Sequence, residues 1–123
     1  MTAANITCES DITIIVSTGD VNLTDIVCKS IISSGGTGGI SLDKVIAAEK
    51  FSFERSTGNV NFNRCDAAEI YVKTGTGDVT GTLLTDKVFI TQTNTGSVDV
   101  PKTVEGGICE IITNTGDIKI DIQ

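Results

Sequence analysis

Residues 115–120 read Thr115-Gly116-Asp117-Ile118-Lys119-Ile120, and this six-residue phrase decides the fold because it recurs along the chain. The glycines of its successive copies are separated by 19, 20, 19, 19 and 20 residues. A fixed period of about twenty residues is typical of a repeat architecture. The earlier copies begin at Thr18-Gly19, Thr37-Gly38, Thr57-Gly58, Thr76-Gly77 and Thr95-Gly96.

Each copy of the phrase combines a corner with the start of a strand. Glycine permits the positive φ of a tight corner, and the apolar residues that follow it alternate with polar ones, as in a half-buried strand. The fourth copy differs, because Gly81 replaces the second apolar residue and Leu83 follows two positions later. This difference predicts a local bulge. The regular pairs are Val21 with Leu23, Ile40 with Leu42, Val60 with Phe62, Val98 with Val100, and Ile118 with Ile120.

The rest of each repeat holds further short apolar segments, which makes about three per repeat, and none has helical periodicity. At 123 residues the chain is expected to form one domain. The sequence predicts an all-β, single-domain parallel β-solenoid, a right-handed β-helix of about six rungs of 19–20 residues. Residues 1–10 are expected to form an entry segment or partial cap, and residues 11–123 the β-solenoid.

Stacking the repeats in sequence order predicts columns of like residues. Two columns are apolar, and two ladders are polar and face outward. The first apolar column comprises Ile26, Val45, Cys65 and Leu84, and the second Ile32, Phe51, Tyr71, Ile90 and Cys109. The first ladder comprises Thr18, Thr37, Thr57, Thr76, Thr95 and Thr115, and the second places Asn94 over Asn114.

The composition excludes several classes of partner. A formal charge of −7 with nine Lys and Arg disfavours nucleic acid and anionic membrane surfaces, since both require a basic surface. No apolar run approaches the ~20 residues that span a bilayer, and no export signal begins the chain. A domain displayed outside the cytoplasm would therefore need an anchor that is not present in this sequence.

The four cysteines, Cys8, Cys28, Cys65 and Cys109, form no C-x-x-C pair, and the chain has no His, so no metal site is expected. Apolar neighbours favour buried free thiols. A disulfide is the alternative, and Cys8 with Cys28 is the one pair at the spacing of a single rung.

The run from Thr103 to Ile111, followed by the phrase at Thr113–Ile120, resembles the bacterial adhesin domains of unknown function. Those domains repeat a Ser/Thr-Gly-Asp-Val/Ile phrase, as this chain does from Thr18 to Ile120. The resemblance implies a β-solenoid that is displayed at the cell surface or tethered to a membrane. It implies no catalytic residues.

Two specific chemistries were weighed against this background. The aspartates of the phrase suggest calcium, but sequence order gives the column Asp20, Gly39, Asn59, Asp78, Ser97, Asp117, in which no two carboxylates are adjacent. Each aspartate is therefore expected to bond its own turn. A polysaccharide-acting β-helix enzyme is a remote alternative, because it needs clustered carboxylates in a cleft. The charged residues nearest to such a cluster are Glu49, Glu54, Arg55, Arg64, Asp66, Glu69 and Lys73, which are expected on the solvated exterior.

We therefore expect a non-enzymatic, surface-displayed, adhesin-like or binding domain, with no cofactor, no metal and no catalytic residues. Its ligand and ligand-binding residues are unknown at this point, and a surface protein or glycan is the expected partner. The alternative is a bactofilin-like structural scaffold that self-associates through its terminal rungs. In sequence order the last rung, Thr115–Ile122, would have a neighbour on one side only and would leave an open edge.

Overall fold

The computed structural model describes residues 2–7, 9–84, 87–100 and 105–122, and these residues form ten strands and no helix. The strands are β1 (Thr2–Thr7), β2 (Asp11–Thr18), β3 (Val21–Thr37), β4 (Ile40–Thr57), β5 (Val60–Thr76), β6 (Val79–Leu83), β7 (Lys87–Thr95), β8 (Val98–Asp99), β9 (Gly107–Thr115) and β10 (Ile118–Ile122).

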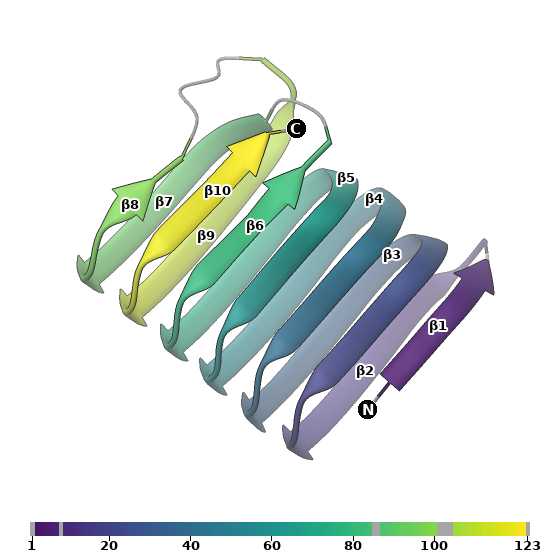
Figure 1. Cartoon of the computed structure of the whole chain (residues 1–123), viewed down its shortest axis with the longest axis horizontal. Helices are drawn as coiled ribbons and strands as arrows, with labels where there is room; N and C mark the ends of the chain where they lie inside the picture. The colour runs from purple at the N-terminus through teal and green to yellow at the C-terminus, as the bar shows by residue number, and fades with distance from the viewer. Residues whose placement is uncertain (1, 8, 85–86, 101–104, 123) are drawn as a thin grey trace.

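All the strand pairings are parallel and join the strands into one coiled sheet, so the predicted parallel β-solenoid of about six turns is confirmed. In Figure 1 the chain runs up a near layer and returns down a far layer as the turns advance toward the C-terminus, which is a right-handed coil. Residues 2–7, assigned above to an entry segment or partial cap, form β1, which pairs with β3 in the near layer.

The turns are built differently from the three separate strands that the sequence suggested. β3, β4 and β5 each pass through almost a whole turn as one continuous strand, bent rather than interrupted. The bends coincide with a column of residues of positive φ and with register shifts a few residues later. Extended pairing therefore continues around the bend. The column of positive φ comprises Asn5, Asp25, Lys44 and Arg64, with φ of 52–56°.

The register shifts explain two errors in the predicted columns. Phe51 pairs with Ile31 and Ile70, one residue away from the expected Ile32 and Tyr71, because the bulge before it adds one residue. Ile90 accordingly faces outward and is 49% exposed. In the first column Ile26 does pair with Val45.

The predicted bulge in the fourth phrase is also present, and it corrects the end of the first column. The register between β5 and β6 shifts after Phe62, which brings Leu83 rather than Leu84 next to Cys65. Leu83 is fully buried, whereas Leu84 is 40% exposed. Gly81 lies against Phe62, where an added Cβ would come within 2.5 Å of the Phe62 Cβ, so only glycine fits beside that phenyl side chain.

The order in which the turns stack is not the order of the sequence. The near layer runs β1-β3-β4-β5-β6-β10-β8, and in the far layer β9 lies between β5 and β7 (Figure 1). The C-terminal turn (residues 107–122) is therefore inserted before the capping turn (residues 87–100), which precedes it in the sequence. The prediction that Thr115–Ile122 has one open side is wrong, because β10 pairs with both β6 and β8.

Burial of apolar side chains accounts for this order. The inward positions of the C-terminal turn hold Ile111, Ile118 and Ile120, all at most 1% exposed. The equivalent positions of the capping turn include Thr91, which is half-buried, and Val98, which is 42% exposed. Since burying an isoleucine side chain contributes about 1.5–3 kcal/mol, placing the more apolar turn inside the stack stabilises the fold.

Two buried cations also escaped prediction. Arg55 points inward and is 2% exposed, not exterior as predicted. Its Nη1 and Nη2 lie 3.5 and 3.3 Å from Val16 O and Ser33 Oγ, Nε has no partner, and burial lowers the pKa of the guanidinium. Gly35 gives it space, because a Cβ there would lie 1.6 Å from Nη1. Lys87 is buried as well, with Nζ 2.8 Å from Asp66 Oδ1.

The cysteines follow the buried-thiol prediction as far as the structure describes them. Cys65 and Cys109 are free and buried. Burial raises the pKa of Cys65, and it raises the pKa of Cys109 to about 12. Cys28 is also buried, but Cys8 lies outside the described residues, so the alternative of a Cys8–Cys28 disulfide is not tested.

A candidate binding groove at the glycine corner

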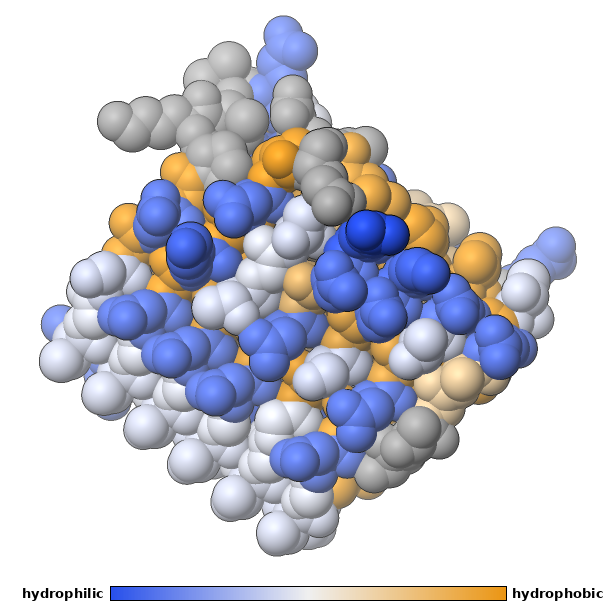
Figure 2. Space-filling view, viewed as in Figure 1, coloured by the Kyte–Doolittle hydropathy of each residue, from blue (hydrophilic) through white to orange (hydrophobic). Residues whose placement is uncertain are grey.

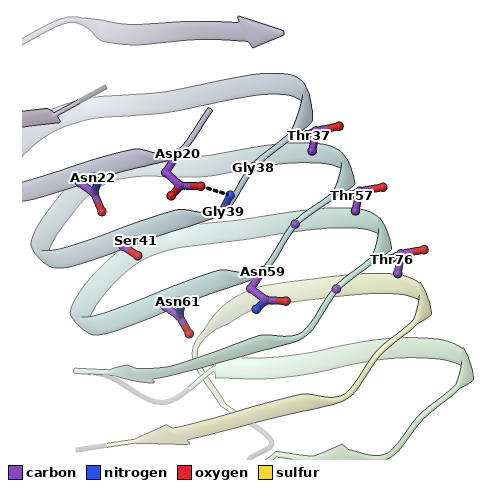
Figure 3. A pocket seen from close by; sticks show the side chains of 12 residues that line it. Asp20, Asn22, Thr37, Gly38, Gly39, Ser41, Thr57, Asn59, Asn61 and Thr76 are labelled. Carbon is purple, nitrogen blue, oxygen red and sulfur yellow. Dashed lines mark hydrogen bonds between the residues drawn. The ribbon is translucent and has the colours of Figure 1, made fainter. Parts of the chain in front are cut away.

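The largest hollow among the described residues follows the glycine corner along the solenoid axis, with a volume of about 570 Å³ (Figure 3). We call it the corner groove. Every residue that lines it belongs to a copy of the repeated phrase or follows it directly. The lining residues are Asp20, Asn22, Thr37, Gly38, Gly39, Ser41, Thr57, Gly58, Asn59, Asn61, Thr76 and Gly77.

Glycines form the floor of the groove because the turns approach closely there. Gly58 and Gly77 have φ of 151° and 150°, a region that other residues rarely adopt. A Cβ on either would lie 2.0 Å from the carbonyl oxygen of the glycine one turn below. The corner is therefore hollow and its side walls come from the flanking residues.

The backbone of the groove is already satisfied by neighbouring turns. Gly38 N donates to Thr57 O and Gly58 N to Thr76 O, at 2.9 and 2.8 Å. Ile40 N likewise donates to Asn59 O at 2.8 Å. An extended peptide binds a sheet by pairing with free backbone groups, so these bonds leave an incoming ligand mainly side chains to contact.

One rim of the groove is a row of exposed threonines, Thr37, Thr57 and Thr76, which pair in register across the turns. Their hydroxyls have no hydrogen-bond partner within the described part of the chain, and Figure 3 shows them pointing outward from the corner. Successive strands lie about 4.8 Å apart. The rim therefore offers one unpaired donor and acceptor at each step along the axis. The full threonine ladder is confirmed, but it ends in the order Thr76, Thr115, Thr95.

The opposite rim carries Asn22, Ser41 and Asn61, also paired in register. Asn61 Oδ1 accepts a hydrogen bond from Thr80 on the next turn. Our sequence analysis did not single out these three residues. The signal was present, since they occupy the outward position between the two apolar residues of each phrase.

The Asp and Asn residues after the corner glycine hold adjacent turns together. Asp20 Oδ1 accepts from Gly39 N, and Asn59 Oδ1 accepts from Asp78 N, both at 2.9 Å. The expectation that each aspartate bonds its own turn is wrong, because each bonds the backbone of the neighbouring turn. The side chain continues the backbone ladder across the corner.

Insertion of the C-terminal turn also changes the basis of the calcium argument. Asp117 is next to Asp78, contrary to the prediction that no two carboxylates are adjacent in this column. Asp117 N donates to Asp78 Oδ1 and Ser97 N donates to Asp117 Oδ1, at 2.9 and 2.8 Å. One oxygen of each carboxylate is thereby engaged. No group of three or more Asp, Glu, Cys or His that could hold a metal occurs among the described residues.

The charged residues weighed for catalysis are distributed over several surfaces. Glu54 pairs in register with Lys73, and Lys50 with Glu69, so opposite charges face each other across adjacent turns. Asp66 pairs with Lys87, and Arg55 is inside the core. Glu49 Oε1 lies 3.7 Å from Lys29 Nζ. These residues therefore form local charge pairs rather than a convergent set.

Asn94 and Asn114 form the second predicted ladder, which is confirmed by a 2.5 Å bond from Asn94 Nδ2 to Asn114 Oδ1. Figure 2 shows that the face seen in Figure 1 is mostly hydrophilic or neutral, with hydrophobic residues visible between. The described residues contain no helix of the length and apolarity needed to cross a membrane.

Comparison with known proteins identifies a domain type but no activity. A family model described as Toastrack DUF4097 matches residues 4–123. Neither the curated proteins nor the solved structures gave a significant match. The match agrees with the β-solenoid repeat fold expected from the sequence resemblance, and it carries no adhesin assignment.

Proposed function

Since the chain belongs to the Toastrack domain family (DUF4097), a domain of unknown function, we propose from its surface that it is a non-enzymatic, adhesin-like binding domain. Its ligand is an uncharged, hydroxyl-rich chain, a neutral glycan, that lies along the corner groove. The observation that carries the proposal is the row of threonine hydroxyls without partners, repeated at every turn beside a row of Asn and Ser side chains.

Three features favour a glycan over other partners. The groove backbone is hydrogen-bonded between turns, which disfavours an added peptide strand. The net charge of −7 and the carboxylate of Asp20 in the lining disfavour an anionic polymer. Hydroxyl and amide groups, which donate and accept hydrogen bonds, suit sugar hydroxyls. Display at the cell surface is part of the same proposal and follows the sequence resemblance.

Titration with soluble neutral oligosaccharides, from disaccharide to hexasaccharide, tests the proposal by calorimetry and NMR shifts. Affinity should rise with length as successive turns are engaged. The triple variant Thr37→Val, Thr57→Val, Thr76→Val keeps the side-chain shape and removes the hydroxyls. It should weaken binding by about tenfold or more, since each lost hydrogen bond costs about 0.5–1.5 kcal/mol.

The matched control is Thr13→Val, an exposed threonine on β2 of the far layer. It should leave the affinity unchanged. Equal losses in the control and the triple variant, or no binding of any neutral oligosaccharide, would refute the groove as a glycan site. Protease treatment of intact cells tests display, because a surface domain should be cleaved while a cytoplasmic marker is protected.

A further inference from the structure

The C-terminal turn fills a slot whose walls belong to other parts of the chain. β9 is paired on one side with β5 and on the other with β7, and β10 is paired with β6 and β8 (Figure 1). Without this turn, the slot would expose two strand edges in each layer. Both walls would then be templates for parallel pairing.

The turn fits the slot through side chains as well as backbone. Cys109 lies between Ile70 and Phe89 in the column, and Ile111 lies between Val72 and Thr91. The threonines add specific bonds, because Thr113 Oγ1 donates to Gly77 O at 3.2 Å and Thr93 Oγ1 to Gly116 O at 3.0 Å. The slot therefore selects this turn by shape, apolarity and hydrogen bonds.

Nothing in these contacts requires the inserted turn to come from the same polypeptide. The turn is the last element of the chain described here, and one covalent connection, from Val100 to Gly106, joins it to the capping turn. A second copy carries an identical turn that makes the same contacts in the same slot. The balance then depends on connection geometry and concentration, as in other exchanges of identical elements between protomers.

We propose that the protein forms a domain-swapped dimer, in which two copies exchange their C-terminal turns, residues 107–122. This inference does not depend on the glycan proposal. It also replaces the expected association through an open last rung, since the C-terminal strand is inside the stack. A dimer would present two corner grooves in one particle, which raises avidity for a polymeric ligand without any new contact.

Cross-linking between differently labelled chains tests the exchange. One chain carries Lys73→Cys and the other Ile112→Cys, both with Cys8→Ser to remove an additional thiol. Residues 73 and 112 are register partners between β5 and β9, on the outward face. The two chains are unfolded together, refolded at high concentration and mildly oxidised. Exchange predicts a covalent heterodimer, and a dimer mass for the unmodified protein under the same conditions.

The control replaces the second chain by one with Gln92→Cys, which lies one strand farther from residue 73 and should give no heterodimer. Chains folded separately by dilution and then mixed should also stay uncoupled. A monomer mass at every concentration, together with no heterodimer after joint refolding, would overturn the proposal. A heterodimer of equal yield with the Gln92→Cys chain would overturn it too, since it would show unspecific coupling.

Discussion

The two halves of this solenoid obey the same repeat but stack differently. In β3, β4 and β5 each turn is one continuous strand, and neighbours in sequence are neighbours in space. From β6 onward the strands are shorter, and the last turn lies inside the one that precedes it. The glycine corner is the same in both halves, since positive φ persists from Gly19 to Gly116.

The halves differ at the opposite corner. Asn5, Asp25, Lys44 and Arg64 turn the chain there with positive φ, and no later non-glycine residue of the described chain has this conformation. The fourth phrase, with Gly81, shortens the strand just before the change of order. The comparison teaches that the glycine phrase defines the cross-section of a turn. The position of the turn in the stack depends on how apolar its inward face is and on the opposite corner.

The largest expected effect breaks the feature that both halves share. Val60→Asp or Val79→Asp should unfold the domain, because each valine is 0% exposed and an unpaired buried carboxylate costs several kcal/mol against a total stability of about 5–15 kcal/mol. Asn61→Asp, exposed and one residue away, should change the melting temperature little. Equal losses in thermal melts of Val60→Asp and Asn61→Asp would show that the inward alternation is wrong.

Lys119→Pro separates the observed order from sequence order. Lys119 pairs with Thr80 on one side and Asp99 on the other, so the lost N–H and the ring should destabilise by about 3 kcal/mol or more. Lys119→Ala keeps the N–H and serves as control, measured by urea unfolding. In sequence order β10 would be an edge strand that tolerates proline, and equal stability of the two variants would support that order.

Gly77→Ala against Gly19→Ala tests how closely stacked turns approach. A Cβ at Gly77 would lie 2.0 Å from Gly58 O, whereas at Gly19 its nearest neighbour is Val16 Cγ1 at 3.7 Å. Both positions pay for positive φ, but only the first adds a clash. Gly77→Ala should be less stable by a further ~2 kcal/mol, beyond the ~1–3 kcal/mol of strain they share. Chemical denaturation that gives the same loss for both would contradict close stacking at the corner.

A smaller effect concerns the inserted turn and alkaline pH. Burial raises the pKa of Cys109 to about 12, whereas an unfolded thiol titrates near 8.5. Above pH ~8.5 the unfolded state loses this proton while the folded state keeps it, so stability falls by up to ~1.4 kcal/mol per pH unit until the folded pKa is reached.

Cys109→Ala should therefore reduce the slope of unfolding free energy against pH between about 9 and 11. Exposed Thr13→Val is a suitable reference with an unchanged slope. A slope identical in wild type and Cys109→Ala would mean that the thiol ionises freely in the folded protein, which is incompatible with its position between Ile70 and Phe89.

Much of the fold follows from the repeated phrase, because glycine corners, alternation and a fixed period are local signals. The sequence also predicted the threonine ladder and the Asn94–Asn114 pair, but not that β9 lies against β5. Thr93-Asn94-Thr95-Gly96 and Thr113-Asn114-Thr115-Gly116 match each other, so either turn fits above β5 by pattern alone.

Other errors have equally physical causes. Bulges of one residue moved Phe51 and Leu83 relative to the predicted columns, and single-residue shifts reverse which face a side chain occupies. Arg55 is buried against the usual preference of charged residues because Gly35, one turn away, leaves room for it. The corner groove was implicit in the outward positions of each phrase, yet its hollow shape depends on glycines aligned across turns.

The most direct test of the account is disulfide trapping within one chain at low concentration. Lys73→Cys with Ile112→Cys joins register partners on adjacent strands, at a spacing of about 4.8 Å that a disulfide can bridge. Lys73→Cys with Gln92→Cys joins residues two strands apart, about 9.6 Å, which it cannot. The inserted C-terminal turn predicts rapid closure of the first pair and none of the second. Closure of the 73–92 pair instead, with the 73–112 pair remaining reduced, would show that the turns stack in sequence order.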